Sequence, residues 1–311
     1  MRSSTKGAES VTEKNHGGDA LLEQITRIRR DQPQKIAEAL RGRRRRALLS
    51  SQGTMFLIAA DHPARGVLKA GSDALAMADR GELLWRLQIA LGRPGVDGVM
   101  ATPDVVEDLA LLGALDGKVV FGSMNRGGLG GSIFELDDRM TAYDAESIRT
   151  SGLDGGKLMV RVADDDATSL ETMVAAAGAI SALAEHELVA MVEVFASRRD
   201  GAKAVNLDDA DSLIRAVAVV QGLGHTSAYT WLKLPVVDDL DRLLRATSLP
   251  VVLLGGDPGS EAARTYRRWE KAMAWPQVIG LVAGRALLYP PDGKVERAVD
   301  EAAAIISGVP G

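Results

Sequence analysis

From about residue 51 to the end of the chain, short apolar segments alternate with longer segments in which apolar residues recur at helical spacing. The apolar segments show almost no polar alternation, which is typical of strands buried on both faces of a parallel sheet. Strands are predicted at residues 55–60, 95–100, 118–122, 157–162, 188–195, 229–237, 249–254 and 278–283. Helices are predicted after them at residues 72–91, 103–115, 144–150, 167–186, 208–222, 238–247, 261–274 and 295–306. Ser72 and Ser260 are the candidate N-caps of the first and seventh helices.

Eight β/α units within about 255 residues have the size and rhythm of an α/β fold of the (β/α)8 type, the TIM barrel. A doubly wound open sheet is the alternative. We expect one barrel domain over residues 51–311, since no linker-like segment interrupts the alternation. Residues 1–50 precede it as a polar, mobile segment to residue 18 and two helices separated by Pro33. The arginine-rich segment 41–46 is expected to be a solvated helix end rather than a nucleic-acid site.

Composition narrows the class of protein. The chain has 311 residues, a net charge of -5 and no cysteine. The negative charge gives no case for nucleic acid or an anionic membrane as partner. The lack of cysteine excludes disulfides, thiolate metal sites and a cysteine nucleophile. Without an apolar span or an apolar leader at the start, a cytoplasmic protein is expected.

Lys233 lies in the middle of the apolar strand 229–237. A lysine rarely enters such a strand without a partner or a task. Burial disfavours the ammonium form, so the pKa of Lys233 is expected to fall towards neutrality and leave a nucleophilic amine, as Schiff-base chemistry requires. The alternatives are a lysine that extends to the barrel rim and one that pairs with a core carboxylate.

In a TIM barrel, the active site forms where the strands run into the loops that follow them. Besides Lys233, the polar side chains at those positions are Asp61, His62, Ser123, Asn125, Arg126, Lys157, Arg161 and Glu193. Strand alternation places Lys157 and Arg161 on one face. A second cation near Lys233 would lower its pKa further, and Glu193 or Asp61 could move protons to and from substrate oxygens. Alternatively, Glu193 neutralises one of the two lysines in a structural ion pair.

Small residues end the last two predicted strands, in Gly255-Gly256-Asp257 and in Gly284-Arg285. Glycines let backbone N–H groups approach a phosphate, and TIM barrels commonly bind phosphate after these strands. The glycine-rich segment 125–132 lacks the ending of a Walker loop and does not open a helix directly, so we expect a lid over the pocket.

A metal site is not expected. Of the four histidines, only His62 lies at a strand end, whereas a zinc-dependent aldolase site needs several imidazoles. A magnesium site of carboxylates alone stays open at the acidic run 164–166. A solvated loop with a helix N-cap is the preferred interpretation of that run.

These motifs resemble those of class I tagatose-1,6-bisphosphate aldolases. The resemblance covers about residues 50–307 and rests on Lys157 before an apolar strand, on Met-Val-Glu193-Val-Phe, on Leu-Lys233-Leu-Pro-Val and on Ala-Gly-Arg285-Ala-Leu. Archaeal-type fructose-bisphosphate aldolases and deoxyribose-phosphate aldolase share the barrel and an initial Asp motif, here Asp61. The layout also resembles an actinobacterial branch of aldolase-like barrels associated with myo-inositol breakdown.

By this resemblance, Lys233 is the Schiff-base lysine, Glu193 and Lys157 are the proton-handling pair, and Asp61 binds substrate hydroxyls. The resemblance further implies that a phosphate is held by Gly256, Gly284 and Arg285. One departure is that Asp61-His62-Pro63 stands where the family has Asp-Gln or Asp-His-Gly. The third loop is also longer, and both differences leave the substrate open.

The sequence therefore predicts a class I aldolase that forms a Schiff base and cleaves a phosphorylated ketose or keto-sugar acid to dihydroxyacetone phosphate and an aldehyde. Arg161, Ser123, Asn125 and Gly255 are expected to contribute to substrate binding. The alternatives are a lysine-dependent, thiolase-like acyl transfer on a phosphorylated diketone and a non-catalytic sugar-phosphate sensor. We expect a phosphorylated sugar as ligand and a homo-oligomer, with no cofactor, metal, nucleic acid or membrane.

Overall fold

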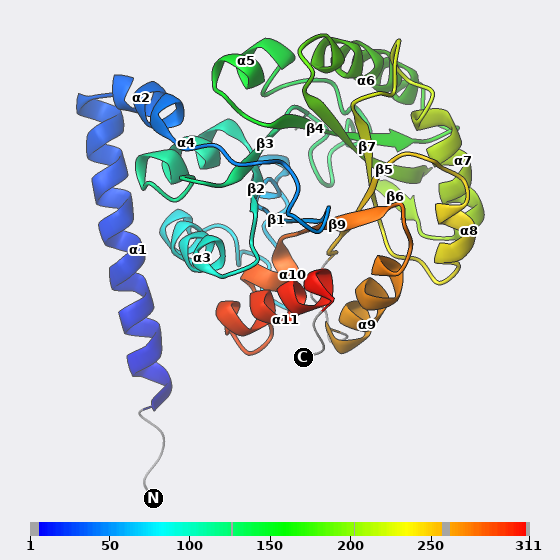
Figure 1. Ribbon diagram of the computed structural model, residues 1–311. Coiled ribbons are helices and arrows are strands. Elements are labelled where there is room, and N and C mark those ends of the chain that lie inside the picture. Colours follow the sequence, from blue (N-terminus) through cyan, green and yellow to red (C-terminus); the bar gives the residue numbers. More distant parts are fainter. Residues whose placement is uncertain (1–5, 126, 202, 257–261, 309–311) are drawn as a thin grey trace, which may run out of the picture.

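The computed structural model describes residues 6–125, 127–201, 203–256 and 262–308. Its centre is a ring of eight parallel strands, which confirms the predicted TIM barrel (Figure 1). In ring order the strands are β1 (Met55–Ala59), β2 (Gly98–Ala101), β3 (Val119–Ser123), β4 (Gly155–Val162), β5 (Val189–Asp200), β7 (Thr230–Leu234), β8 (Val251–Leu254) and β9 (Val278–Ala283). Pairing of β9 with β1 and of β4 with β5 closes the ring.

Helices surround the ring and cover its outer face (Figure 1). They are α3 (Arg80–Gly92), α4 (Pro103–Leu111), α5 (Ala145–Thr150), α6 (Thr168–Glu185), α7 (Ala210–Val220), α8 (Leu240–Leu244), α9 (Ala262–Met273), α10 (Arg285–Leu288) and α11 (Val295–Ser307). Strand side chains alternate between two cores: Met55 and Leu57 fill the barrel interior, and Phe56 and Ile58 pack under the helices. Both faces of each strand are therefore dry, which explains the uninterrupted apolar runs.

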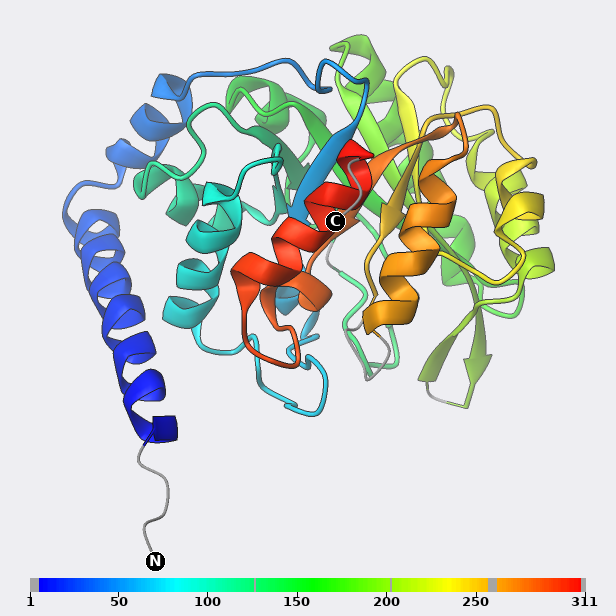
Figure 2. The ribbon, with the colours of Figure 1, turned by 60° about the horizontal axis from the view of Figure 1, so that its bottom comes forward.

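One strand was not predicted. β5 continues past Phe195 and turns back as β6 (Lys203–Leu207), which pairs with it antiparallel. Figure 2 shows this hairpin projecting from the end of the barrel. β6 has the sequence Lys-Ala-Val-Asn-Leu, and none of its residues is fully buried. It lacks the apolar signal by which the barrel strands are recognised.

The first helix of the barrel, predicted at residues 72–91, starts later than expected. α3 begins at Arg80, and its N-cap is Asp79, whose carboxylate accepts a hydrogen bond from Glu82 N at 2.8 Å. The prediction that Ser72 caps this helix is wrong, and Leu75, which falls within the predicted helix 72–91, is exposed. Asp79 with Glu82 three residues later is the stronger N-terminal signal. The other proposed cap, Ser260, lies outside the described residues.

Two helices precede the barrel, α1 (Lys6–Asp31) and α2 (Gln34–Gly42), and they separate at Pro33 as predicted. α1 begins well before the expected start at Asp19 and continues through Gly17 and Gly18. A Cβ on Gly18 would lie 2.8 Å from the carbonyl carbon of Gly81 in α3. The glycines allow α1 to lie directly against α3 (Figures 1 and 2), so close packing outweighs their low helix propensity.

The arginine run is solvated only in part, since Arg44 and Arg45 are exposed but Arg43 is buried, and it continues beyond the end of the helix. α2 stops at Gly42, and Arg43 and Arg45 pair with Asp154 at 3.3 and 2.8 Å. Arg44 and Arg46 pair with Asp116 and Asp97. These three aspartates precede β4, β3 and β2, so the run fastens the extension across the amino-terminal end of the barrel. None of the described helices combines the length and apolar character that crossing a bilayer requires.

Candidate active site

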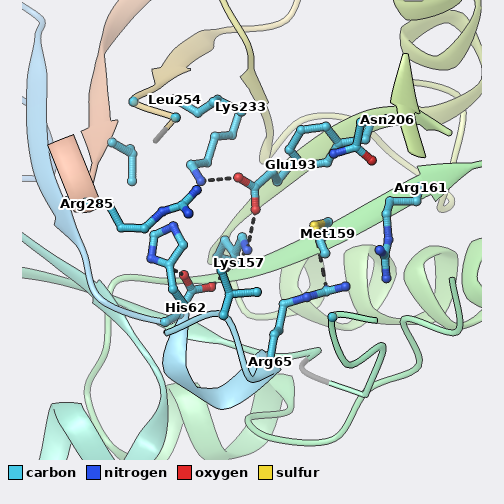
Figure 3. Close-up of a pocket in the computed structure, with 18 of the residues that line it drawn as sticks. His62, Arg65, Lys157, Met159, Arg161, Glu193, Asn206, Lys233, Leu254 and Arg285 are labelled. Carbon is cyan, nitrogen blue, oxygen red and sulfur yellow. Dashed lines mark hydrogen bonds and ion pairs between the residues drawn. The ribbon is translucent and has the colours of Figure 1, made fainter. Parts of the chain in front are cut away.

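A cavity of about 330 Å3 opens at the carboxyl ends of the strands (Figure 3). The residues predicted from strand ends that line it are Asp61, His62, Lys157, Arg161, Glu193, Lys233, Gly255, Gly256, Gly284 and Arg285. Arg126 and Asp257 lie outside the described residues. The fold thus brings most of the predicted set together, because parallel strands deliver their carboxyl ends to one side of a barrel.

At the base of the cavity, two lysines share one carboxylate. Strand register places Glu193 of β5 beside Lys233 of β7, and Lys233 Nζ contacts Glu193 Oε1. Lys157 Nζ on β4 lies 2.5 Å from Glu193 Oε2 and 3.0 Å from Asp61 Oδ2 (Figure 3). All four side chains are buried, with Lys157 1% and Lys233 3% exposed. The ion pair considered as an alternative is therefore present, and it includes both lysines.

The carboxylate of Glu193 is held in its ionised form. Burial would raise its pKa, but the neighbouring ammonium groups of Lys157 and Lys233 outweigh burial and lower the pKa of Glu193 well below its ordinary range. Two ammonium groups and two carboxylates balance in charge, as a buried cluster requires. Because Glu193 contacts both lysines, it can pass a proton from one to the other without rearrangement of the backbone.

Ser123 and Asn125 lie behind the cavity and do not line it. Ser123 Oγ donates to Asp61 Oδ2 at 2.9 Å, so it orients the carboxylate that Lys157 contacts. Asn125 Nδ2 donates to the carbonyls of Asp138 and Met159, and Asn125 Oδ1 accepts from Met159 N at 2.8 Å. Both side chains are fully buried. Asn125 therefore fastens the glycine-rich loop to β4.

In another part of the cavity, two arginine side chains donate hydrogen bonds to one aspartate. Arg161 donates to both oxygens of Asp138, at 2.7 Å from Nε and 3.0 Å from Nη2. Arg65 Nη1 donates to Asp138 Oδ1 at 2.6 Å. Asp138 is fully buried, whereas both arginines line the cavity. A buried carboxylate of this kind fixes the guanidinium groups in place.

The glycines after β8 and β9 serve different purposes. A Cβ on Gly284 would lie 2.2 Å from the Ala59 carbonyl oxygen, and one on Gly255 would lie 2.6 Å from Ala283 Cβ. Packing against neighbouring strands alone therefore requires glycine at both positions. Gly256 has φ +67°, where glycine is favoured, and open space where a Cβ would be. Arg285 Nη1 donates to the Lys69 carbonyl at 3.3 Å.

Sequence reasoning missed Arg65, Glu135, Met159, Phe195 and Asn206 as cavity residues. Met159 and Phe195 follow from strand alternation, since they share the inward face with Lys157 and Glu193. The other three lie on η1 (Pro63–Arg65), on the loop before α5 and on the unpredicted strand β6. Their positions in the sequence follow no spacing that would predict a cavity residue.

The glycine-rich loop lies against the cavity, as Gly130 lines it and Gly130 N donates to the Arg65 carbonyl at 2.9 Å. The acidic run has structural contacts: Asp164 pairs with Arg215, Asp165 accepts from Arg199 N, and Asp166 pairs with the Arg199 side chain. Within the described part of the chain, no group of three or more histidine, aspartate or glutamate residues is placed to hold a metal ion.

The comparisons with known proteins agree with this architecture. A sequence model of the Cgl0159-like family matches residues 53–303 of the chain. The crystal structure of Cgl0159 from Corynebacterium glutamicum is 47% identical, with a TM-score of 0.90, over 93% of this chain and 97% of that chain. No functionally curated protein gives a significant match.

More distant structures share the barrel. A Schiff-base-forming fructose-1,6-bisphosphate aldolase has a TM-score of 0.63 at 17% identity, over 87% of this chain and 99% of that chain. An archaeal fructose-1,6-bisphosphate aldolase, solved with its catalytic lysine bound to the carbinolamine intermediate, has a TM-score of 0.61 at 17% identity, over 89% and 100% of the two chains. At these identities the likeness shows the fold alone.

Proposed function

This chain belongs to the Cgl0159-like family, and from that premise we propose that it is a class I, metal-independent aldolase acting on a phosphorylated ketose or keto-sugar acid. The observation that carries the proposal is Lys233, buried at the base of the cavity and in contact with Glu193, which also contacts Lys157. Two aldolases with this barrel form a Schiff base or carry a lysine-bound carbinolamine. The motif resemblance to tagatose-1,6-bisphosphate aldolases and to barrels linked to myo-inositol breakdown supports the same class.

In the proposed reaction, Glu193 relays a proton from Lys233 to the ketone oxygen as the free amine attacks the ketone carbon. The carbinolamine then loses water to give an iminium, which draws electrons from the adjacent carbon–carbon bond. That bond breaks as the neighbouring hydroxyl loses its proton, and the aldehyde leaves. The resulting enamine takes up a proton on carbon, and water releases dihydroxyacetone phosphate and the free lysine. In this proposal, Glu193 and Lys157 supply and accept these protons.

The remaining cavity residues position the substrate in this proposal. Asp61 is fixed by Ser123 and Lys157 and binds a hydroxyl next to the reacting carbonyl. Gly256 and Arg285, at the ends of β8 and β9, bind the phosphate through backbone N–H groups and the guanidinium. Ser123 and Asn125 support the site from behind rather than contact the substrate.

The experiment that tests the proposal is cleavage of ketose phosphates by the wild-type protein and by Lys233→Met. In the variant, Glu193 keeps its 2.5 Å contact with Lys157, so no carboxylate is stranded and the barrel should fold normally. Cleavage should fall by several orders of magnitude, because the covalent step is lost. A folded Lys233→Met protein that still cleaves ketose phosphates would exclude this mechanism and make Lys157 the next candidate.

A further inference from the structure

The cavity has a second end, across the barrel from the proposed phosphate position. In the ring of eight strands, β4 lies four positions from β9 in either direction, so Arg161 on β4 faces Arg285 after β9 across the cavity. Figure 3 shows Arg65, Arg161 and Asn206 on the side opposite Arg285 and Leu254, with Lys233 and Glu193 between them. We call the part formed by Arg65, Arg161, Glu135 and Asn206 the distal end. A substrate with its phosphate at Arg285 and its carbonyl at Lys233 reaches the distal end with its far carbons.

We propose that the distal end binds uncharged hydroxyl groups and disfavours a second phosphate, so that the substrate is a ketose phosphate with one anionic end and a polyol tail. This inference rests on the proposed function and narrows it to a substrate class. It separates this chain from an aldolase that acts on a bisphosphate, and it selects the ketose phosphate over the keto-sugar acid, whose carboxylate would be a second anionic end.

The first support is charge. The two guanidinium groups of the distal end meet two carboxylates, Asp138 at hydrogen-bond distance and Glu135 at 3.6 Å from Arg161 Nη1. The two guanidinium groups and the two carboxylates therefore sum to zero net charge. A second phosphate here would be brought next to the carboxylate of Glu135, which itself lines the cavity. Like charges placed together in a partly buried site disfavour the wrong ligand.

The second support is the mixture of donors and acceptors. A hydroxyl both donates and accepts a hydrogen bond, whereas a phosphate dianion only accepts. Glu135 offers an acceptor, the arginines offer donors, and Asn206 offers both. Asn206 Oδ1 accepts from Ser197 Oγ at 2.9 Å, which fixes the amide within the β5–β6 hairpin. A fixed set of this kind matches a chain of hydroxyl groups.

The test uses two linear hexitol phosphates, D-glucitol 6-phosphate and D-glucitol 1,6-bisphosphate. Neither has a carbonyl, so their binding does not depend on Lys233 chemistry. Their dissociation constants for the wild-type protein would be measured by titration calorimetry at fixed ionic strength. The bisphosphate should bind no more tightly than the monophosphate, because its second phosphate meets Glu135.

Glu135→Gln removes the distal carboxylate and keeps an oxygen for Gly131 N, the present partner of Glu135 Oε2. The ratio of the two dissociation constants should then shift about tenfold in favour of the bisphosphate. Glu171→Gln is the matched control, since Glu171 is an exposed glutamate on α6 that does not line the cavity. It should leave the ratio unchanged.

Three results would overturn the proposal. Tenfold or tighter binding of the bisphosphate to the wild-type protein would show that the distal end takes an anion, and would leave the aldolase proposal standing. An unchanged ratio in a folded Glu135→Gln protein would exclude Glu135 as the discriminating residue. Failure of both hexitol phosphates to bind would overturn the distal end together with the phosphate position on which it rests.

Discussion

Glu193 links the chemistry of the site to the stability of the barrel. Its pKa is lowered in the folded protein by the two lysines, against the effect of burial. A carboxyl whose folded pKa is lowered stabilises the fold above its unfolded pKa of about 4.3, and that stabilisation is lost as the pH falls towards the folded value. Glu193 is therefore expected to contribute at neutral pH and to lose its contribution on acidification.

The variant Glu193→Gln checks this expectation. At pH 7 it should lower the free energy of unfolding by about 3–5 kcal/mol, because two buried ammonium groups lose a shared carboxylate. The difference from wild type should shrink as the pH is lowered from 5 to 3 in urea unfolding experiments. Glu171→Gln, at an exposed position, should show no such difference. A gap that stays constant over that pH range would contradict the ionised state assigned to Glu193.

At the residue scale, the sequence predicted the base of the site and Arg161, but missed Arg65, Glu135 and Asn206. Lys233, Glu193 and Lys157 were found because a charged side chain inside an apolar strand is rare. Ser123 and Asn125 also follow a strand, but their side chains are turned to Asp61 and to β4, a choice that depends on hydrogen-bond partners distant in sequence. Arg65 and Asn206 were missed because they come from a short helix and a hairpin.

At the scale of elements, α1 is held to the barrel by close backbone contact. Gly18→Val adds a side chain where a Cβ alone would lie 2.8 Å from Gly81. We expect α1 to separate from α3, with amide exchange in α1 at least about tenfold faster by mass spectrometry and with unchanged catalytic activity. Valine has the higher helix propensity, so faster exchange would reflect the lost contact.

Ala20→Val is the matched control, because Ala20 is an exposed position of the same helix. It should leave exchange in α1 nearly unchanged. Full protection of α1 in Gly18→Val would show that the glycine contact does not hold the helix. The contact itself could not be predicted, since two glycines in a polar segment indicate a mobile chain until the partner helix is known.

The other elements were also predictable only where the local sequence carried the signal. Each barrel strand was recognisable because both of its faces are dry, whereas β6 lies outside the barrel and carries no apolar run. The arginine run 43–46 could not be distinguished from a solvated helix end, because its aspartate partners precede strands that are distant in sequence.

At the scale of the whole molecule, eight repeated units predicted the closed barrel, and closure brought the strand ends to one cavity. The proposed chemistry in that cavity uses lysine and carboxylate side chains. We therefore expect the aldolase activity to survive dialysis against EDTA. Loss of activity that is restored by a divalent ion would contradict the class I assignment.

The most direct test of the account is reductive trapping on the intact protein. The wild-type protein would be incubated with dihydroxyacetone phosphate and borohydride, digested, and mapped by mass spectrometry. We expect a covalent adduct on Lys233 in the wild-type protein, no adduct at position 233 in Lys233→Met, and an adduct still on Lys233 in Lys157→Met. An adduct on Lys157 in the wild-type protein, or no adduct on either lysine, would contradict the account.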